Sequence, residues 1–308
     1  MIRSTPAALA LAFAAGFASA QQQLHYTYLW HLEQPIYWPA RQATGADRYE
    51  RAWESILRRD AGAPNPANDL REIFGLEDRR AVYQYRAKEA IAAISGKPEA
   101  GAQISFSGGL IENLMSLGGA SQLGYSPTWY SDLRTARSWN TAAPGAVKPR
   151  CDIVLFSFHH ALLPLVDDST VRKEIQLYKR IYGDAWGSSL PLSKGFFPSE
   201  MAFSMRLIPL LAAEGVEWVM VSGEKLSRAC PDFPVVFGSG GVNCDPPNRA
   251  DQLNPAQGNY HRVSISRGCA PAEAAPFAFT PHRARFIDPN SGAASSVIVV
   301  PCSQSLGW

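Results

Sequence analysis

Short apolar runs alternate with stretches of helical spacing along residues 24–222, and this alternation limits the fold more than any other feature of the chain. The run at residues 152–158 is almost entirely apolar, as expected of a strand buried on both faces. Strands that alternate with helices in this way form a parallel sheet, so the sequence predicts an α/β fold. The expected strands cover residues 25–31, 103–107, 153–158, 195–198 and 217–221, with two more at 260–266 and 296–300.

Helices are expected between these strands. Apolar residues recur at helical spacing in residues 46–59, 79–94, 171–182 and 204–214. Asp168 and Ser169 give a start signal for the third of these helices, and Gly183 gives a stop signal. After residue 222 the alternation weakens, and residues 231–259 read as a long loop.

Four polar residues stand at or just past the ends of expected strands: His31, Glu112, His159 and Glu200. The carboxyl ends of parallel strands lie at one edge of a sheet, which is where β/α barrels and open α/β sheets place their chemistry. We therefore expect the four side chains to line one site.

Glu200 has the most informative local context. Phe196 and Phe197 favour a strand, Pro198 tends to end it, and Glu200 follows at once. Residues 201–207 then read as the start of the next helix. The alternative is a surface carboxylate in the first turn of that helix, stabilised by the helix dipole.

The first twenty residues have the form of a signal peptide. Arg3 supplies the positive start, residues 7–17 are apolar, and Ala18-Ser19-Ala20 is a small-x-small cleavage site. The apolar run is shorter than the roughly 20 residues that span a bilayer. We expect a secreted or periplasmic mature chain, residues 21–308, without a membrane span.

Composition excludes several classes of protein. The chain is 46% hydrophobic and 11% aromatic, which argues against disorder. The net charge is +2 and no Lys/Arg-rich run is present, which argues against a nucleic-acid partner.

The cysteines indicate disulfides rather than metal binding. The five cysteines form no C-x-x-C pair, so no structural zinc site is expected. In an oxidising compartment Cys230 and Cys244 are the first candidates for a disulfide, because residues 231–243 read as one loop. Cys151 is then expected to be a buried thiol near a strand start.

Four segments together resemble the motifs of glycoside hydrolase family 57 in order and spacing. They are Trp30–Pro35, Gly109–Glu112, Ser157–His160 with Pro164 and Leu165, and Gly195–Ser204. The resemblance covers most of residues 24–222, and more faintly residues 297–308.

The resemblance implies a (β/α)7-type parallel barrel, complete or incomplete, formed by residues 21–308 and loop-rich after residue 222. It implies action on α-glucans or maltooligosaccharides, without a cofactor, by a retaining mechanism with a Glu nucleophile and an Asp acid/base. Glu200 matches the nucleophile. Glu112 matches a motif near the sugar subsites, and His31 and Gln34 match the first motif, which contacts sugar.

Two departures from the family pattern stand out. Glu33 occupies the position of a family histidine, and no residue after Glu200 matches the acid/base Asp. Asp288 lies at a distance along the chain from Glu200 that would suit the acid/base residue, but residues 288–292 read as a turn. Glu112 or Glu33 would be the remaining sources of a second carboxyl, although neither occupies the family's acid position. The alternative function is therefore a non-catalytic or degenerate α-glucan-binding homologue.

Further contacts to sugar are expected from aromatic and histidine side chains. Tyr37 and Trp38 suit stacking on sugar rings, although core packing also employs such residues. Adjacent residues on a strand point to opposite sides, so one of His159 and His160 faces the site, and we assign His159. A polysaccharide deacetylase is disfavoured, because the chain lacks its paired Asp residues and its His-x-x-x-His ligands.

The signal peptide and the loop between the cysteines give a first testable prediction. Mass spectrometry of the exported protein should find a chain that begins at Gln21, with Cys230 and Cys244 protected from alkylation until a reductant is added. A chain that keeps residues 1–20, or alkylation of both cysteines without reduction, would contradict it.

Overall fold

The computed structural model describes residues 27–36, 50–62, 69–142, 147–223, 261–263, 272–274 and 280–302. The strands are β1 (Leu29–Leu32), β2 (Ala102–Phe106), β3 (Cys151–Ile153), β4 (Gly195–Phe196), β5 (Trp218–Ser222), β6 (His261–Val263), β7 (Ala272–Ala274), β8 (His282–Ile287) and β9 (Ala294–Cys302). The α-helices are α2 (Ala52–Asp60), α3 (Leu70–Gly75), α4 (Glu77–Gln84), α5 (Arg86–Ala93), α6 (Gly108–Gly119), α7 (Ser131–Arg137), α8 (Asp168–Trp186) and α9 (Leu207–Ala213). Two 3-10 turns complete the described set, η1 (Leu163–Leu165) and η2 (Ser199–Met201).

Parallel pairing organises the strands. One sheet has the order β1-β2-β3 and a second has the order β4-β5-β9-β8, in which only β8 is antiparallel to its neighbour. A parallel bridge between Leu155 and Phe196 connects the two sheets just beyond β3. The parallel strands of both sheets therefore point their carboxyl ends to the same side.

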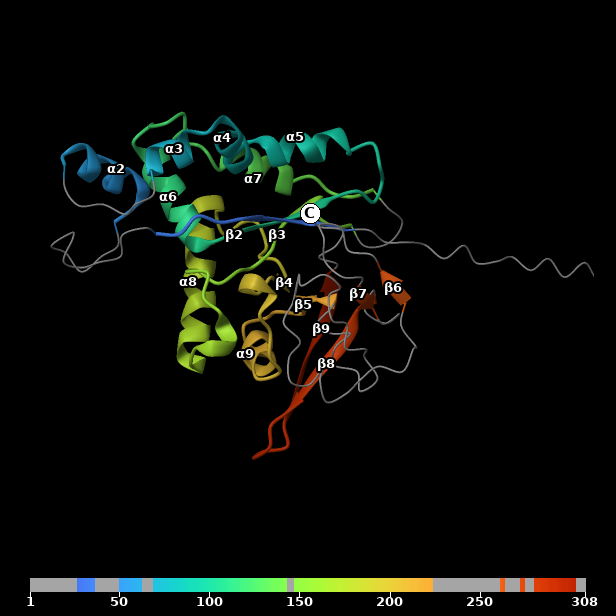
Figure 1. Ribbon diagram of the computed structural model, residues 1–308. Helices are drawn as coiled ribbons and strands as arrows, with labels where there is room; N and C mark the ends of the chain where they lie inside the picture. Colours follow the sequence, from blue (N-terminus) through green and yellow to red (C-terminus); the bar gives the residue numbers. More distant parts are fainter. Residues whose placement is uncertain are drawn as a thin grey trace, which may run out of the picture.

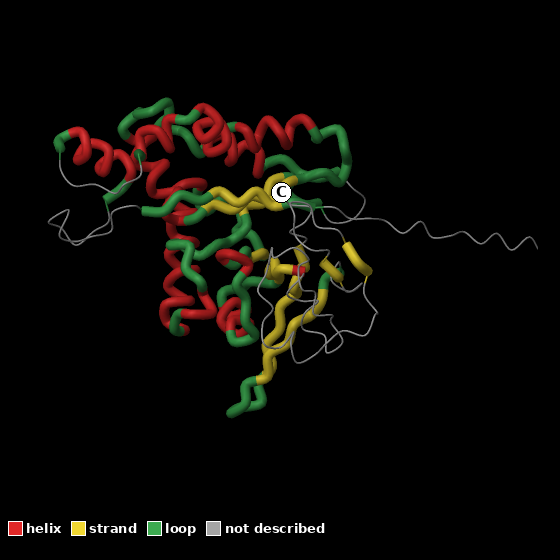
Figure 2. Tube along the Cα trace, viewed as in Figure 1, coloured by secondary structure: helices red, strands yellow, loops and turns green. Residues whose placement is uncertain are grey.

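The predicted α/β architecture with parallel strands is confirmed. No closed barrel is found among the described residues, since β1 and β8 stand at the two ends of the strand order. In Figures 1 and 2, α2 to α5 and α7 gather along β1, β2 and β3. Helix α6 packs against α2 and α8, and α9 packs against β9 and β8 with α8 beside it.

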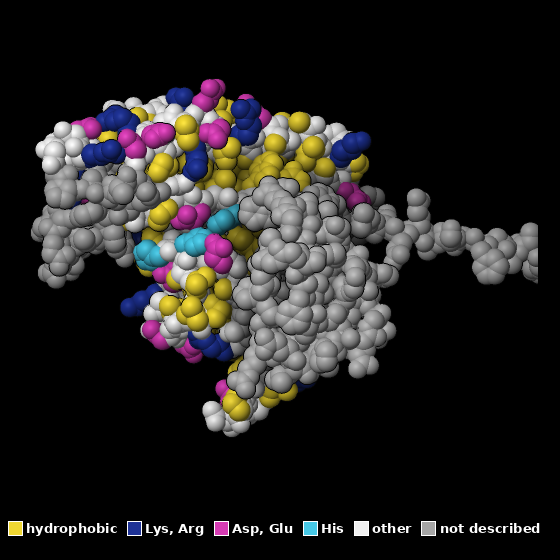
Figure 3. All heavy atoms as spheres, viewed as in Figure 1, with side chains coloured by type: hydrophobic (Ala, Val, Ile, Leu, Met, Phe, Trp, Pro, Cys, Tyr) yellow, Lys and Arg dark blue, Asp and Glu magenta, His cyan; other side chains and the backbone are white. Residues whose placement is uncertain are grey.

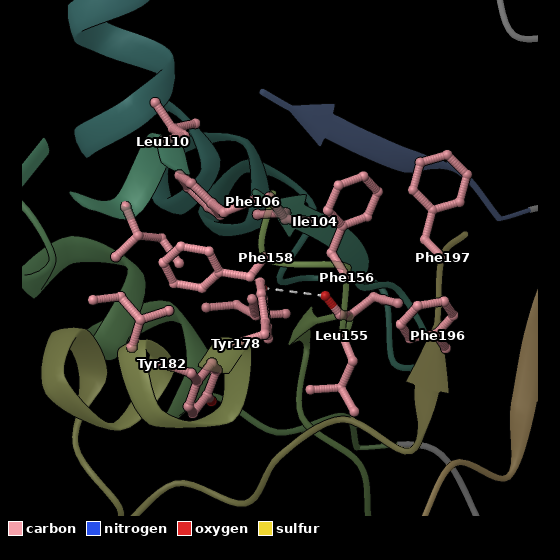
Figure 4. Close-up of a cluster of buried hydrophobic side chains, with 14 of the residues drawn as sticks. Ile104, Phe106, Leu110, Leu155, Phe156, Phe158, Tyr178, Tyr182, Phe196 and Phe197 are labelled. Carbon is pink, nitrogen blue, oxygen red and sulfur yellow. Dashed lines mark hydrogen bonds between the residues drawn. The ribbon is translucent and has the colours of Figure 1, made fainter. Parts of the chain in front are cut away.

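The core lies where the strands meet these helices. Ile104 and Phe106 of β2, Phe156 after β3 and Phe196 of β4 are fully buried. Figure 4 shows this cluster, with Phe156 and Phe197 side by side under β1. Because the same segments carry the polar residues at the strand ends, core packing also fixes where those polar residues lie.

Each of the seven predicted strands has a counterpart, with shifted ends. β1, β2, β3, β4 and β5 overlap the first five expected runs, β6 lies within the expected strand at 260–266, and β9 extends the expected strand at 296–300. β8 and β7 were not expected from the sequence. Between β8 and β9, the Asp288 carboxylate accepts hydrogen bonds from the backbone N–H groups of Asn290 and Ser291, both at 2.8 Å. Residues 288–292 therefore form the predicted turn.

The helix predictions need more correction. The stretch 79–94 is two helices, because Tyr85 leaves helical geometry between α4 and α5. The long helix α8 is capped by Asp167, not Asp168, and passes through Gly183 to end at Gly187, whose φ is 85°. The turn η2 occupies the predicted helix start at Met201, so α9 begins only at Leu207.

Cys151 opens β3 and is fully buried, as predicted. Burial raises the pKa of its thiol to about 12, which makes the thiolate inaccessible near neutral pH. Cys230 and Cys244 lie outside the described residues.

The pairing of Gly195 with Trp218 gives a prediction about stability. A Cβ atom at Gly195 would lie 2.0 Å from the Trp218 indole, so Gly195→Ala must displace the ring or the strand. We expect the free energy of unfolding in urea to fall by about 1–3 kcal/mol, as for other overpacked sites. The matched control is Gly75→Ala in α3, where nothing lies within 4 Å of the added atom. Equal stability of the two variants would contradict the close approach.

Candidate functional site

The segment that follows β1 is fixed by hydrogen bonds from a buried asparagine. The Asn113 amide donates to the Pro35 carbonyl at 3.1 Å and accepts from the Ala52 N–H at 3.0 Å. The Ser107 N–H bonds the Leu32 carbonyl at 3.1 Å. Residues 33 and 34 are thus held between two anchored positions, and both line a cleft at the end of the sheet.

The segment that follows β4 is equally constrained. The Phe197 N–H donates to the Leu155 carbonyl at 2.9 Å, and the buried hydroxyls of Ser157 and Ser199 are 2.7 Å apart. Glu200 then adopts φ 55° and ψ 25°, a left-handed conformation that is uncommon for residues other than glycine. Such backbone conformations persist where the surrounding structure enforces them, and they are frequent at functional sites. The Glu200 side chain is 71% exposed, on the rim of the cleft.

A chain of polar contacts connects β1 to Glu200 through His160. His31 Nδ1 lies 2.9 Å from Ser105 Oγ, and His31 Nε2 lies 3.4 Å from His160 Nε2. The same His160 nitrogen lies 3.5 Å from Glu200 Oε1. Because a carboxylate only accepts, His160 Nε2 carries the proton that faces it. His31 Nε2 must then be an acceptor, so His31 carries its own proton on Nδ1 and donates it to Ser105.

His31 is held in the neutral form that this arrangement requires. Its ring packs against Phe156 and Phe197, with ring centroids 4.8 and 5.1 Å away. Partial shielding of the ring from water by the surrounding protein, and the nearby His160, lower the pKa of His31 to about 4. Near neutral pH the ring is therefore an uncharged hydrogen-bonding group.

Glu33 lies in the same electrostatic environment. Burial raises the pKa of its carboxyl above the ordinary value. The electrostatic effect of His160 opposes that rise, and that of Glu200 adds to it. Two carboxyl groups from different strands therefore influence each other across the cleft.

The cleft has a volume of about 480 Å³. It is lined by the segment after β1, by His160 and Glu200, and by one side of α4: His31, Leu32, Glu33, Gln34, Asp78, Arg79, Val82, Tyr83, His160 and Glu200. Figure 3 shows histidine and acidic side chains next to one another on this face of the molecule. The lining combines hydrogen-bond donors and acceptors with few apolar side chains, which suits a polyhydroxylated ligand.

The predicted site residues divide into three groups. His31, Gln34 and Glu200 line the cleft together. Glu112 and His159 lie outside its lining: Glu112 faces Arg51 at 3.5 Å, and His159 Nδ1 lies 2.7 Å from the Glu174 carboxylate. Tyr37 and Trp38 fall outside the described residues. The sugar-binding roles of the last four residues stay predictions.

Sequence reasoning missed the part that His160 and α4 play. Of the adjacent histidines, His160 turns to the cleft because its backbone has a φ of 60°, which breaks the alternation of an extended strand. Asp78, Arg79, Val82 and Tyr83 come from a helix without any motif. Only the position of His160 next to His159 gave a signal in the sequence.

Within the described ranges, no group of three or more His, Cys, Asp or Glu side chains is placed to hold a metal ion. None of the helices in the described part of the chain is both long and apolar enough to cross a membrane.

The low pKa of His31 predicts how stability depends on pH. In the unfolded chain His31 takes up a proton near pH 6.5, whereas in the folded chain it does so only near pH 4. Between these values the unfolded state binds more protons, so this contribution to stability is lost as the pH falls from about 6.5 to about 4. His31→Gln should flatten the pH dependence of the free energy of unfolding in this window.

The measurement is urea unfolding at several pH values, with His282→Gln on β8 as the control. A His31→Gln profile with the same slope as the wild type would show that the ring titrates normally.

Comparison with known proteins identifies the family. The model of glycosyl hydrolase family 57 matches residues 76–237, more than half of the chain. The chain is 30% identical over 257 residues to an α-amylase of Niallia circulans, an alignment that covers 80% of this chain and 20% of that protein. The chain thus spans about a fifth of the length of this curated relative.

Solved structures give a weaker likeness. A 4-α-glucanotransferase from Thermococcus litoralis aligns with a TM-score of 0.47 and 15% identity, over 91% of this chain and 28% of that one. A branching enzyme from Thermococcus kodakaraensis aligns with a TM-score of 0.42 and 12% identity, over 80% of this chain and 46% of that one. On the match of the family model, this chain belongs to glycosyl hydrolase family 57.

Proposed function

We propose that this protein acts on α-glucans or maltooligosaccharides as a retaining glycoside hydrolase or glucanotransferase, with Glu200 as the nucleophile. The observation that carries the proposal is the position of Glu200: the end of β4 and a left-handed backbone hold its carboxylate over the cleft. Membership of the family and the α-amylase name of the curated relative support the substrate class.

The chemistry follows from the exposed position of Glu200. A retaining enzyme attacks the anomeric carbon with one carboxylate and forms a covalent glycosyl intermediate that water or another sugar then resolves. The nucleophile must be ionised and must point at the sugar. The side chain of Glu200 is largely exposed, and His160 Nε2 lies 3.5 Å from its Oε1 atom, a contact that orients the carboxylate.

The cleft suits a sugar in size and lining. Its volume of about 480 Å³ lies within the range of ligand pockets, about 300–1,000 Å³. Gln34 and His160 offer hydrogen bonds to hydroxyl groups, whereas Tyr83 on α4 lines the cleft but is itself buried. Tyr37 and Trp38, which lie outside the described residues, remain the predicted aromatic contacts to sugar.

A second candidate is a glucan-binding homologue without activity. It is favoured by one observation: no residue after Glu200 matches the acid/base Asp of the family. The two candidates differ in whether Glu200 becomes covalently labelled by substrate. We also propose export from the cytoplasm, which rests on residues 1–20 alone.

The test is trapping of the glycosyl intermediate with a 5-fluoro-α-glucosyl fluoride. We expect one glycosyl unit on the wild-type chain, assigned to Glu200 by peptide mapping. Glu200→Gln should remain unlabelled and should lose at least about 10³-fold in hydrolysis of aryl α-glucosides, as removal of a nucleophile does elsewhere.

The control for this test is Glu217→Gln, which removes a carboxylate from an exposed surface pair with Lys194. It should label like the wild type. Binding of maltooligosaccharides by a wild-type chain that is never labelled would instead support the glucan-binding homologue.

A further inference from the structure

The cleft contains a second carboxyl group that is better enclosed than the nucleophile. Among the described residues, three carboxylates line it: Glu33 after β1, Asp78 on α4 and Glu200 after β4. Retaining glycoside hydrolysis requires one carboxyl as nucleophile and another that protonates the leaving oxygen. The partner of Glu200 can therefore be sought among residues that share its cleft.

We infer that Glu33 is the acid/base residue of this site, a role that the family pattern gives to an aspartate. The inference rests on the proposed function, because it assigns the partner of Glu200. Glu33 stands where the family motif has a histidine, so this chain carries a carboxyl group after β1 that the motif does not.

Geometry supports the assignment. Glu33 follows β1 directly, between Leu32, which accepts from Ser107, and Pro35, which accepts from Asn113. Its backbone is thus fixed on both sides, as a group that must meet a glycosidic oxygen requires. Glu33 and Glu200 approach the cleft from different strands, and His160 interacts with both carboxyl groups.

The charged groups around Glu33 suit a residue that acts first as a general acid and then as a general base. The groups that share its cleft are His31, His160, Glu200, Asp78, Arg79 and Tyr83. Burial and the Glu200 charge raise the pKa of Glu33, against the opposing effect of His160. Once Glu200 is glycosylated its negative charge disappears, the pKa of Glu33 falls, and the group is ready to accept a proton.

The other carboxyl groups near the strand ends are less suitable. Asp78 is exposed in the first turn of α4, where its carboxylate accepts from the Arg79 N–H at 2.7 Å. Glu112 faces Arg51 outside the cleft. Asp288 lies in the turn between β8 and β9, where the N–H groups of Ser291 and Asn290 hold its pKa below the usual value.

The reaction has two steps, glycosylation of Glu200 and its deglycosylation. In the first, Glu200 bonds to the anomeric carbon, the glycosidic bond breaks with its electron pair on the leaving oxygen, and that oxygen takes the proton of Glu33. In the second, the Glu33 carboxylate removes a proton from water while the water oxygen bonds to the anomeric carbon. The bond to Glu200 then breaks and its electron pair returns to the carboxylate.

The test compares substrates that differ in their need for a proton. In the full chain, Glu33→Gln should lower hydrolysis of maltooligosaccharides by about 10²–10⁴-fold, the usual contribution of general acid catalysis. Formation of the glycosyl intermediate from a dinitrophenyl α-glucoside should fall less than about 10-fold, because this leaving group departs without protonation. In Glu33→Ala, added azide should restore turnover and yield an α-glucosyl azide.

The outcomes separate the two proposals. If Glu200 is labelled and Glu33→Gln hydrolyses maltooligosaccharides like the Glu217→Gln control, Glu33 is not the acid and Glu200 remains the nucleophile. Glu33 is likewise excluded if Glu33→Gln loses activity equally on both substrates and azide does not restore the turnover of Glu33→Ala. It is also excluded if the wild type is labelled but does not hydrolyse maltooligosaccharides. If the wild type is neither labelled nor active on the aryl glucoside, the proposed function fails and the assignment of Glu33 fails with it.

Discussion

The parallel bridge between residue 155 and β4 is the interaction on which the site depends. The Leu155 N–H donates to the Gly195 carbonyl at 3.1 Å, and the Leu155 carbonyl accepts from the Phe197 N–H at 2.9 Å. These two bonds join two sheets that are otherwise separate among the described strands. They also set the register in which His160, a few residues after Leu155, meets Glu200, a few residues after β4. A shift in this register would move the segment that carries Glu200 along the segment that carries His160 and would separate the two side chains.

Aromatic packing and proton placement are coupled in the same region. Phe156 and Phe197 contribute to the core and also form the walls that keep His31 neutral. A neutral His31 accepts from His160, which leaves the His160 proton shared between a ring nitrogen and the Glu200 carboxylate. Core packing therefore sets the hydrogen-bond direction at the cleft, and large-to-small changes of either phenylalanine should disturb both.

Much of this arrangement could be predicted from the sequence, and the reasons for the failures are physical. Residue types showed where the strands end, and the carboxyl ends of parallel strands lie at one edge of the sheet. The sequence therefore predicted that His31, Gln34 and Glu200 lie close together. The choice between His159 and His160 depended on a backbone torsion, which residue order does not encode locally. The carboxylate of Glu174 in α8 then holds His159 through both its ring and its N–H.

Helix ends and long-range pairing were harder to predict. Gly183 suggested a stop, but buried Tyr182 and Trp186 continue the apolar face of α8 past it, so tertiary packing outweighed the local signal. Glu112 was grouped with the site because its motif follows β2, yet α6 turns it towards Arg51. Asp288 was correctly assigned to a turn, since Asp, Pro, Asn, Ser and Gly in succession have a local explanation.

The reversed direction of β8 has a practical consequence for labelling the molecule. β9 runs parallel to β5, so its carboxyl end lies on the side of Glu200, and its amino end, with the hairpin turn at residues 288–292, lies on the opposite side. Figure 1 shows the hairpin projecting away from the helices. A fluorophore or affinity peptide inserted in this turn would be remote from the cleft and from bound sugar. The hairpin is therefore a suitable attachment site for immobilising the protein with its cleft facing solution.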